Sequence, residues 1–120
     1  MIGRLYSVVI DCPEPRALAP FYAELLGLRV NEANSDETWV VLEGDGQRFA
    51  FQQTRDEYRP PRWPDPDHPQ QYHLDVEVHD VEAAEARVLA LGAKRLPGEG
   101  KDFRVYADPV GHPFCLVWDV

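Results

Sequence analysis

The sequence predicts an α+β fold made of two tandem βαβββ modules. Three observations support this fold: a repeat along the chain, the same order of expected elements in each half, and a proline-rich segment between the halves. The chain has 120 residues, enough for one compact domain with a real core but too few for two independent domains. We expect a single domain, with module one at about 1–55, a linker or lid at about 56–69 and module two at about 70–120.

The repeat is visible in the residues that end helices and form turns. A shift of 65 residues aligns Leu26-Gly27 with Leu91-Gly92, Gly46 with Gly111, and Phe49 with Phe114. Between these points "LEGDGQRFAF" and "YADPVGHPFCL" share a pattern of strand, acidic residue, tight glycine-containing turn and second strand. Chance is the weaker explanation, because several turn glycines and both helix ends coincide.

In module one a strand is expected at 5–10, where "LYSVVI" is apolar and rich in β-branched residues. Pro15 suits an early helical position, and apolar residues recur at helical spacing as far as Gly27, a good residue to follow a helix. Pro20 has no backbone N–H, so the regular helix is expected to start near it. Three more strands are expected at 28–33, 38–43 and 48–54.

Module two is expected to follow the same order. A strand at 71–78 leads to Asp80, a suitable helix N-cap. An apolar helical stripe then ends at Gly92 and consists of Val81, Ala84, Val88 and Leu91. Strands are expected at 93–96, 103–108 and 114–120. The intervening "RDEYRPPRWPDPDHP" is too rich in proline to pair as a strand.

Composition and charge exclude several classes of partner. The formal net charge is −9, a field that repels phosphate backbones and anionic membrane surfaces, so no nucleic-acid or membrane partner is expected. No apolar run approaches the roughly 20 residues needed to span a bilayer. The first residues lack the apolar region and cleavage site of a signal peptide, which favours a cytoplasmic protein with Cys12 and Cys115 as free thiols.

The stretch "QQYHLDVEVHD" alternates with the period of a strand that has one buried face. Its apolar parity holds Tyr72, Leu74, Val76 and Val78, and its polar parity holds Gln71, His73, Asp75, Glu77 and His79. A polar strand face is usually solvated. Here it carries a histidine close to acidic residues, so the same face is also a candidate functional surface.

Several segments resemble the glyoxalase/bleomycin-resistance/extradiol-dioxygenase superfamily, also called the vicinal oxygen chelate superfamily. They are "FYAELLG", "HLDVEVHDVEAAEARVLALGA" and "DPVGHPFCL". More narrowly, "VVIDCPEP", "FAFQQ", "RWP" and "DPVGHPFCLVW" resemble glyoxalase-like domain proteins of actinobacterial type. The resemblance implies curved mixed sheets around a cavity, helices packed outside, the polar parity of "HLDVEV" facing the cavity, and a homodimer.

The resemblance also implies where a divalent metal would bind, because family enzymes hold it by the first and last strands of each module. The matching positions here are Ser7 and Ala50 in module one and His73 and Cys115 in module two. Serine is a poor ligand and alanine cannot bind, so the family's usual centre is expected to be absent and no cofactor is expected. The alternative is an improvised divalent-metal site with His73 and Cys115.

Other polar residues could complete a site of either kind. Gln52 and Asp75 could supply oxygens to a metal, and Gln52 could equally hydrogen-bond a ligand. The pair His73 and Asp75 could act as a catalytic general base or bind a ligand, or could simply hydrogen-bond across the sheet. Cys115 could be a nucleophile or ligand, but a buried small hydrophobe is the favoured reading.

Three further candidates depend on which way their side chains point. Trp63, between prolines, could be an aromatic wall or lid over the cavity, or could pack the seam between modules. Arg104 and Tyr106 share one strand face, which binds a ligand if it faces inward and is surface otherwise. Glu82 and Glu85 on the second helix are interpreted as a solvated face.

The functional hypothesis is a small-molecule-binding protein that encloses an organic ligand without the family's usual metal. Its candidate ligand-binding residues are Gln52, Trp63, His73, Asp75, Arg104, Tyr106 and Cys115. The rival is a lyase, isomerase or dioxygenase-type enzyme that uses His73 with Asp75, or an improvised metal with Cys115. A third alternative is a vestigial cavity in an interaction module.

Overall fold

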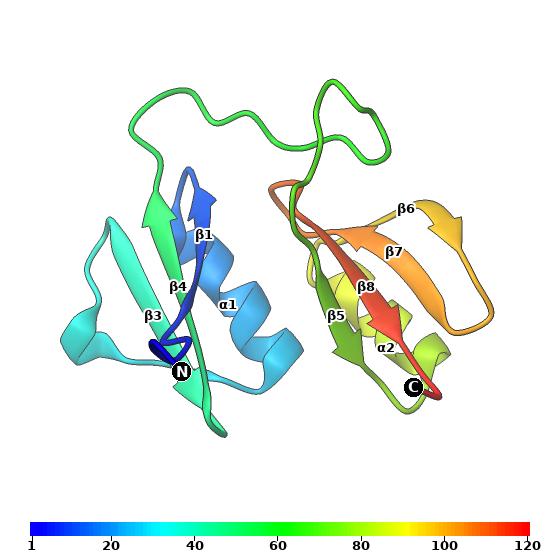
Figure 1. Ribbon diagram of the computed structural model, residues 1–120, viewed down its shortest axis with the longest axis horizontal. Coiled ribbons are helices and arrows are strands. Elements are labelled where there is room, and N and C mark those ends of the chain that lie inside the picture. Colours follow the sequence, from blue (N-terminus) through cyan, green and yellow to red (C-terminus); the bar gives the residue numbers. More distant parts are fainter. The chain divides into compact units, whose positions relative to one another are not determined.

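The computed structural model describes residues 1–120, which form two compact units, Met1–Tyr58 and Arg59–Val120 (Figure 1). The boundary falls inside the segment expected as a linker, and most of that segment belongs to the second unit. Each unit holds one four-stranded sheet and one α-helix, which confirms the predicted α+β fold of two tandem βαβββ modules.

The first unit contains four strands, one α-helix and one short 3₁₀ helix. They are β1 (Val8–Cys12), α1 (Pro15–Leu26), β2 (Arg29–Val30), η1 (Glu32–Asn34), β3 (Trp39–Gly44) and β4 (Gln47–Gln53). The sheet order is β1-β4-β3-β2, with β1 parallel to β4 and the other pairs antiparallel. The parallel pair needs a crossover, and α1 supplies it.

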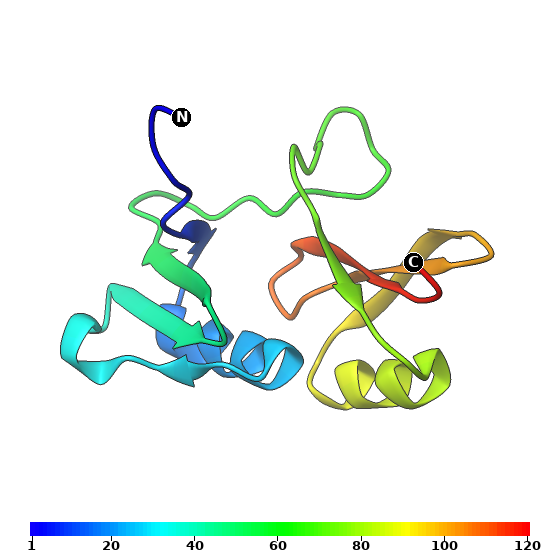
Figure 2. The same cartoon turned by 60° about the horizontal axis from the view of Figure 1, so that its bottom comes forward.

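The second unit repeats this topology. Its elements are β5 (Leu74–Glu77), α2 (Val81–Ala90), β6 (Lys94–Glu99), β7 (Phe103–Ala107) and β8 (Pro113–Val117). The order β5-β8-β7-β6, with β5 parallel to β8, matches the first sheet strand for strand. In both units the helix covers one face of the sheet and leaves the other face without a helix (Figures 1 and 2). We call the second face the open face.

Helix α1 starts earlier than the sequence suggests. It runs from Pro15 at its first turn to Leu26, with Pro20 inside it and Gly27 in the left-handed conformation at φ 67°. The missing N–H of Pro20 removes one hydrogen bond without ending the helix. Pro20 lies on the exposed side of the helix, and burial of the apolar side against the sheet compensates for that loss. The buried side chains on that side are Leu18, Phe21 and Tyr22.

Helix α2 begins as predicted at Asp80, whose carboxylate accepts a hydrogen bond from the Ala83 N–H at 3.1 Å. Its apolar stripe is weaker than expected, because only Val88 is fully buried and Leu91 is 38% exposed. The helix meets its sheet through polar contacts as well.

The first strand of each unit is shorter than expected. β1 begins at Val8, and Leu5 and Tyr6 before it are 85% and 75% exposed. β5 begins at Leu74, and Tyr72 is 89% exposed. The predicted alternation holds inside β5, where Leu74 and Val76 are half-buried while Asp75 is exposed.

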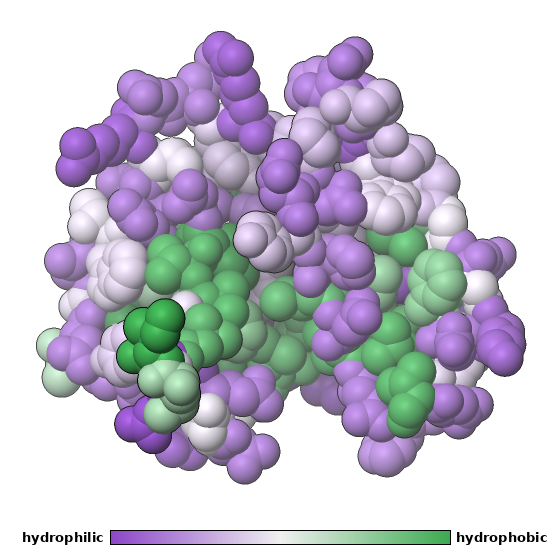
Figure 3. All heavy atoms as spheres, in the orientation of Figure 1, coloured by the Kyte–Doolittle hydropathy of each residue, from purple (hydrophilic) through white to green (hydrophobic).

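Aromatic residues lie between each helix and its sheet. In the first unit the rings of Tyr22 and Phe51 lie 5.4 Å apart, and in the second the rings of Tyr106 and Phe114 stack at 5.5 Å. These contacts identify the helix-covered face of each sheet. In the view of Figure 3, many apolar side chains also gather over the open faces. No helix has the length and apolar character needed to cross a membrane.

Candidate functional site

Strand register places the candidate residues of the second unit on one sheet face. Asp75 pairs with Cys115 across β5 and β8, and Cys115 pairs with Val105 across β8 and β7. Paired residues point to the same side of a sheet, and residues two apart on a strand share that side. His73 precedes β5 by one residue, two before Asp75, and its contact with that carboxylate puts it on the same side. This is the open face.

The three polar side chains meet at one point. The His73 Nε2 and Asp75 Oδ1 atoms are 3.3 Å apart, and one ligand atom from each of His73, Asp75 and Cys115 lies within 4.8 Å of the others. The side chains of His73 and Asp75 are 39% and 60% exposed, whereas Cys115 is only 6% exposed. The site therefore has a buried thiol below an accessible imidazole and carboxylate.

The Cys115 thiol is held neutral. Burial raises its pKa to about 11, helped by the negative charge of Asp75 and by a hydrogen bond with that carboxylate. A thiol with a raised pKa is a poor nucleophile at neutral pH. The sequence reading of Cys115 as a buried small side chain agrees with this environment.

Trp63 lies on the same open face. Its indole N–H donates to the Pro97 carbonyl at 2.8 Å, and its ring centroid is 6.3 Å from that of His73 in an edge-on arrangement. A Cβ placed on Gly98 would lie 3.6 Å from both the indole nitrogen and a methyl group of Val105. The indole therefore stands over the sheet beside the three polar side chains.

The loop that carries Trp63 is held by its own hydrogen bonds. The Arg62 N–H donates to the His68 carbonyl at 2.8 Å, and Asp65 Oδ1 accepts from the Asp67 N–H at 2.8 Å. The second Asp65 oxygen lies 3.2 Å from His68 Nδ1. The Asp67 hydrogen bond lowers the pKa of Asp65, and His68 adds to that effect against some desolvation. His68 thus stabilises a loop, as its proline-adjacent position suggests.

Arg104 and Tyr106 lie on the opposite, helix-covered face, so the hypothesis that they bind a ligand beside His73 is corrected. The Arg104 Nη2 atom lies 2.6 Å from Glu82 Oε1, and the Tyr106 hydroxyl donates to Glu85 Oε1 at 2.7 Å. Burial, reinforced by Glu85, raises the pKa of Tyr106 to about 12. The role of these two residues depends on which face of the sheet their side chains occupy, and the sequence alone does not assign that face.

The interpretation of Glu82 and Glu85 as a solvated face holds for Glu82, whose side chain is 72% exposed, but is wrong for Glu85. Glu85 accepts from Tyr106 and from Arg95 at 2.6 Å, and its side chain is only 20% exposed. The Tyr106 hydrogen bond, opposed by desolvation and supported by Arg95 and Arg104, lowers the pKa of Glu85. These ionic contacts join α2 to its sheet.

Gln52 belongs to the other unit. It lies on β4 between Asp11 and Trp39, on the open face of the first sheet, and is exposed. Its neighbour Gln53 points to the other face and donates to the Pro13 carbonyl at 3.2 Å.

A family model for the glyoxalase-like domain matches residues 7–117, nearly the whole chain. The chain belongs to the glyoxalase-like domain family. This places it in the vicinal oxygen chelate superfamily and confirms the resemblance in "HLDVEV" and "DPVGHPFCL".

Solved structures show the same fold at low identity. A glyoxalase/bleomycin resistance protein/dioxygenase family enzyme from Burkholderia phytofirmans superposes with a TM-score of 0.77 at 17% identity, covering 98% of this chain and 100% of its own. A glyoxalase-related enzyme from Fulvimarina pelagi gives 0.70 at 17% identity, covering 98% and 89%. A possible glyoxalase from Bacillus cereus gives 0.69 at 13%, covering 98% and 99%. A search of curated proteins finds no match.

In this glyoxalase-like chain the first unit lacks the polar cluster of the second. The strand pair Val9 and Ala50 in the first unit occupies the same register positions as Asp75 and Cys115 in the second. Ser7 corresponds to His73, because each lies one residue before the first strand of its unit. The Ser7 hydroxyl donates to the adjacent Val8 carbonyl at 3.3 Å. Valine and alanine offer no ligand atom, so the residues present do not fit a metal centre that draws on both modules.

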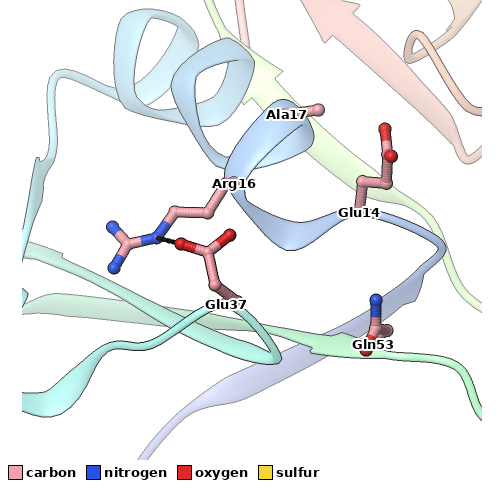
Figure 4. A pocket seen from close by; sticks show the side chains of 5 residues that line it. All are labelled: Glu14, Arg16, Ala17, Glu37 and Gln53. Carbon is pink, nitrogen blue, oxygen red and sulfur yellow. Dashed lines mark ion pairs between the residues drawn. The ribbon is translucent and has the colours of Figure 1, made fainter.

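Sequence reasoning missed a surface depression at the start of α1 (Figure 4). It has a volume of about 300 Å³ and is lined by Glu14, Arg16, Ala17, Glu37 and Gln53. Arg16 is already paired, with Glu37 at 3.7 Å and with Glu32 at 3.0 Å. These ion pairs satisfy the one cation there, and no motif in the sequence marks the depression.

Proposed function

We propose that this glyoxalase-like protein binds a small organic molecule on the open face of its second unit, without the family's usual metal centre. The observation that carries the proposal is the gathering of Trp63, His73, Asp75 and Cys115 on one face of β5, β8 and β6. The equivalent positions of the first unit hold Ser7, Val9 and Ala50. Only the second unit brings a histidine, a carboxylate and an indole together at these positions, which supports a binding site on its open face.

The chemistry of these groups favours a ligand that combines a flat apolar part with hydrogen-bond donors. Trp63 offers an aromatic surface, and its indole N–H is held by Pro97, so the ring is positioned before a ligand arrives. Asp75 offers a carboxylate that is 60% exposed. His73 can donate or accept, which suits a hydroxyl or an amine.

An enzyme is the second candidate, and one distance favours it. His73 Nε2 lies 3.3 Å from Asp75 Oδ1, so the carboxylate can orient the imidazole and stabilise its protonated form. A general base of this kind would serve a lyase or isomerase. It requires a second positioned group, and the Cys115 thiol, whose pKa is raised to about 11 by burial, is a poor nucleophile at neutral pH.

A ligand-observed NMR screen of metal-stripped protein against small aromatic and hydroxylated compounds tests the proposal. We expect saturable binders whose affinity falls about tenfold or more in His73→Ala and Trp63→Ala, a loss of roughly 1.4 kcal/mol. His79→Ala, which changes an exposed histidine outside the cluster, is the matched control and should bind as the unmodified protein does.

The outcomes separate the candidates. A binder returns each compound unchanged, whereas an enzyme converts it and loses turnover in His73→Ala while remaining folded. Equal binding by the unmodified protein, His73→Ala and Trp63→Ala would contradict a site on this face.

A further inference from the structure

We propose that the ligand bound on the open face of the second unit is an organic cation, a primary amine joined to a flat apolar group. The inference rests on the proposed function and adds the charge of the ligand, which that proposal leaves open. In this arrangement the Asp75 carboxylate accepts hydrogen bonds from the ammonium group, and the Trp63 indole contacts the apolar group.

Two carboxylates lie along β5 on the open face. Asp75 and Glu77 are two residues apart in this strand, so their side chains point to the same side and their Cα atoms are about 6–7 Å apart. Both side chains are exposed, and Glu77 forms no ion pair with a basic residue. Asp75 contacts only the His73 imidazole and the Cys115 thiol. This edge of the sheet therefore carries negative charge that no Lys or Arg neutralises.

The basic side chains nearest to this site are engaged elsewhere. Arg95 and Arg104 lie on the helix-covered face, where they pair with Glu85 at 2.6 and 3.3 Å. Lys94 has a register position on the open face, but on the edge strand opposite β5, three strand spacings or about 14 Å away. Arg62, in the loop before β5, interacts with an aspartate of that loop. An anionic ligand would therefore meet the two β5 carboxylates without a compensating cation.

Trp63 supplies an aromatic contact beside these carboxylates. Its indole is half-buried and donates to Pro97 at 2.8 Å, and its ring centroid lies 6.3 Å from that of His73. The Nε2 atom of His73 is in turn 3.3 Å from Asp75. A group bound beside His73 is thus within reach of both an aromatic ring and a carboxylate. Because the face of an indole attracts cations, Trp63 favours the ammonium group as well as the apolar part of the ligand.

Three probes of matched shape test the charge of the ligand. Phenethylamine, phenethyl alcohol and hydrocinnamate carry a positive, a neutral and a negative end on the same phenyl ring. Saturation-transfer NMR titrations of the full chain, stripped of metal with a chelator, measure their affinities. Exposed ion pairs and cation–π contacts are individually weak, so we expect the amine to bind about tenfold tighter than the alcohol, and hydrocinnamate to bind weakest. Added salt should reduce this preference, because it screens exposed charges.

Two substitutions locate the ammonium group. Asp75→Asn keeps the shape of the side chain and should lower the affinity for phenethylamine about tenfold, while the affinity for phenethyl alcohol stays within about twofold. Glu77→Gln should have a smaller effect that disappears in high salt. Asp45→Asn, in the β3–β4 turn of the first unit, changes the net charge equally and is the matched control. Circular dichroism verifies folding, and the comparison of the three probes on the unmodified protein needs no variant.

Three results would overturn the inference: hydrocinnamate or phenethyl alcohol binding as tightly as phenethylamine, an amine affinity that Asp75→Asn leaves unchanged, or an equal loss in Asp75→Asn and Asp45→Asn. If the uncharged or anionic probe binds and depends on His73 and Trp63, the proposed function stands and only the positive charge of the ligand is wrong. The absence of saturable phenethylamine binding at millimolar concentration also overturns the inference, and the wider ligand screen then decides whether the proposed function survives.

Discussion

At the scale of single residues, environment decides what each polar side chain does. Cys115 and Asp75 face each other across one strand pair, and the buried thiol is kept protonated by its surroundings and by the neighbouring charge. Glu85 is a carboxylate on α2 that accepts a hydrogen bond from Tyr106 and forms ion pairs with two arginines of the sheet. As a result the pKa of Cys115 is raised and the pKa of Glu85 is lowered from the ordinary values of these side chains.

Cys115 should react slowly with iodoacetamide in a Cys12→Ser background. With its pKa near 11, the thiolate fraction at pH 8 is about 100-fold smaller than for a thiol of pKa 9. The rate should climb as the pH rises toward 11. Mass spectrometry of the alkylated protein measures it.

Asp75→Asn should lower the pKa of Cys115, because it removes a neighbouring negative charge. The alkylation rate at pH 8 to 9 should therefore rise. A rate that does not change would show that burial alone holds the thiol neutral. Glu77→Gln, a nearby charge change in the same strand, is the control and should leave the rate near that of the unmodified protein.

Glu85→Gln should destabilise the protein by about 1–3 kcal/mol at pH 7, because Tyr106, Arg95 and Arg104 lose a charged partner. The folded-state pKa of Glu85 is lowered, so its stabilisation is present above its unfolded pKa and is lost as the pH falls through its folded value. The difference between the two proteins should thus shrink from pH 7 toward pH 3. Urea unfolding at both pH values measures this trend, and an unchanged difference would argue against it.

At the scale of elements, the repeat builds two similar modules with different helix starts. Asp80 caps α2 with a side-chain hydrogen bond, whereas Glu14 occupies the N-cap of α1 without one. Pro15 compensates in α1, because a proline in the first turn has no N–H that needs a partner. The same topology is therefore reached by two local routes.

Asp80→Ala should lower the free energy of unfolding by about 1 kcal/mol, the usual cost of an N-cap lost to alanine. Glu14→Ala at the equivalent position should change it by less than about 0.5 kcal/mol, because no capping hydrogen bond is lost. Chemical denaturation of both variants makes the comparison. Equal effects would mean that capping does not distinguish the two helices.

At the scale of the whole molecule, apolar residues remain exposed near the N-terminus. Met1, Ile2, Leu5 and Tyr6 are each at least 75% exposed, and Val9 on the edge strand β1 is 44% exposed. Tyr6 is anchored on one side, where the Arg48 guanidinium lies 4.4 Å from its ring centroid. Clustered apolar exposure of this kind is typical of a surface that another chain covers.

We expect the protein to form a homodimer in solution, as the family resemblance implies. Light scattering coupled to size exclusion should give twice the chain mass of 13.7 kDa. Replacing Leu5 and Tyr6 by serine should shift the equilibrium toward monomer, because it removes apolar surface. A monomeric mass for the unmodified protein would contradict the expectation, and Leu89→Ser, at an exposed site on α2, is the control.

The sequence by itself determined the fold, the repeat, the α2 cap and the polar parity of "HLDVEV", because these depend on local periodicity, turn glycines and capping chemistry. The tertiary structure decided the rest. Pro20 stays inside α1 because side-chain burial outweighs one hydrogen bond, and Arg104 and Tyr106 face α2 because sheet register sets their parity. Register across β5 and β8 is also what brings Cys115 to Asp75 from 40 residues away. No local sequence pattern predicts the contact between Cys115 and Asp75, since it depends on which strands pair and in which register.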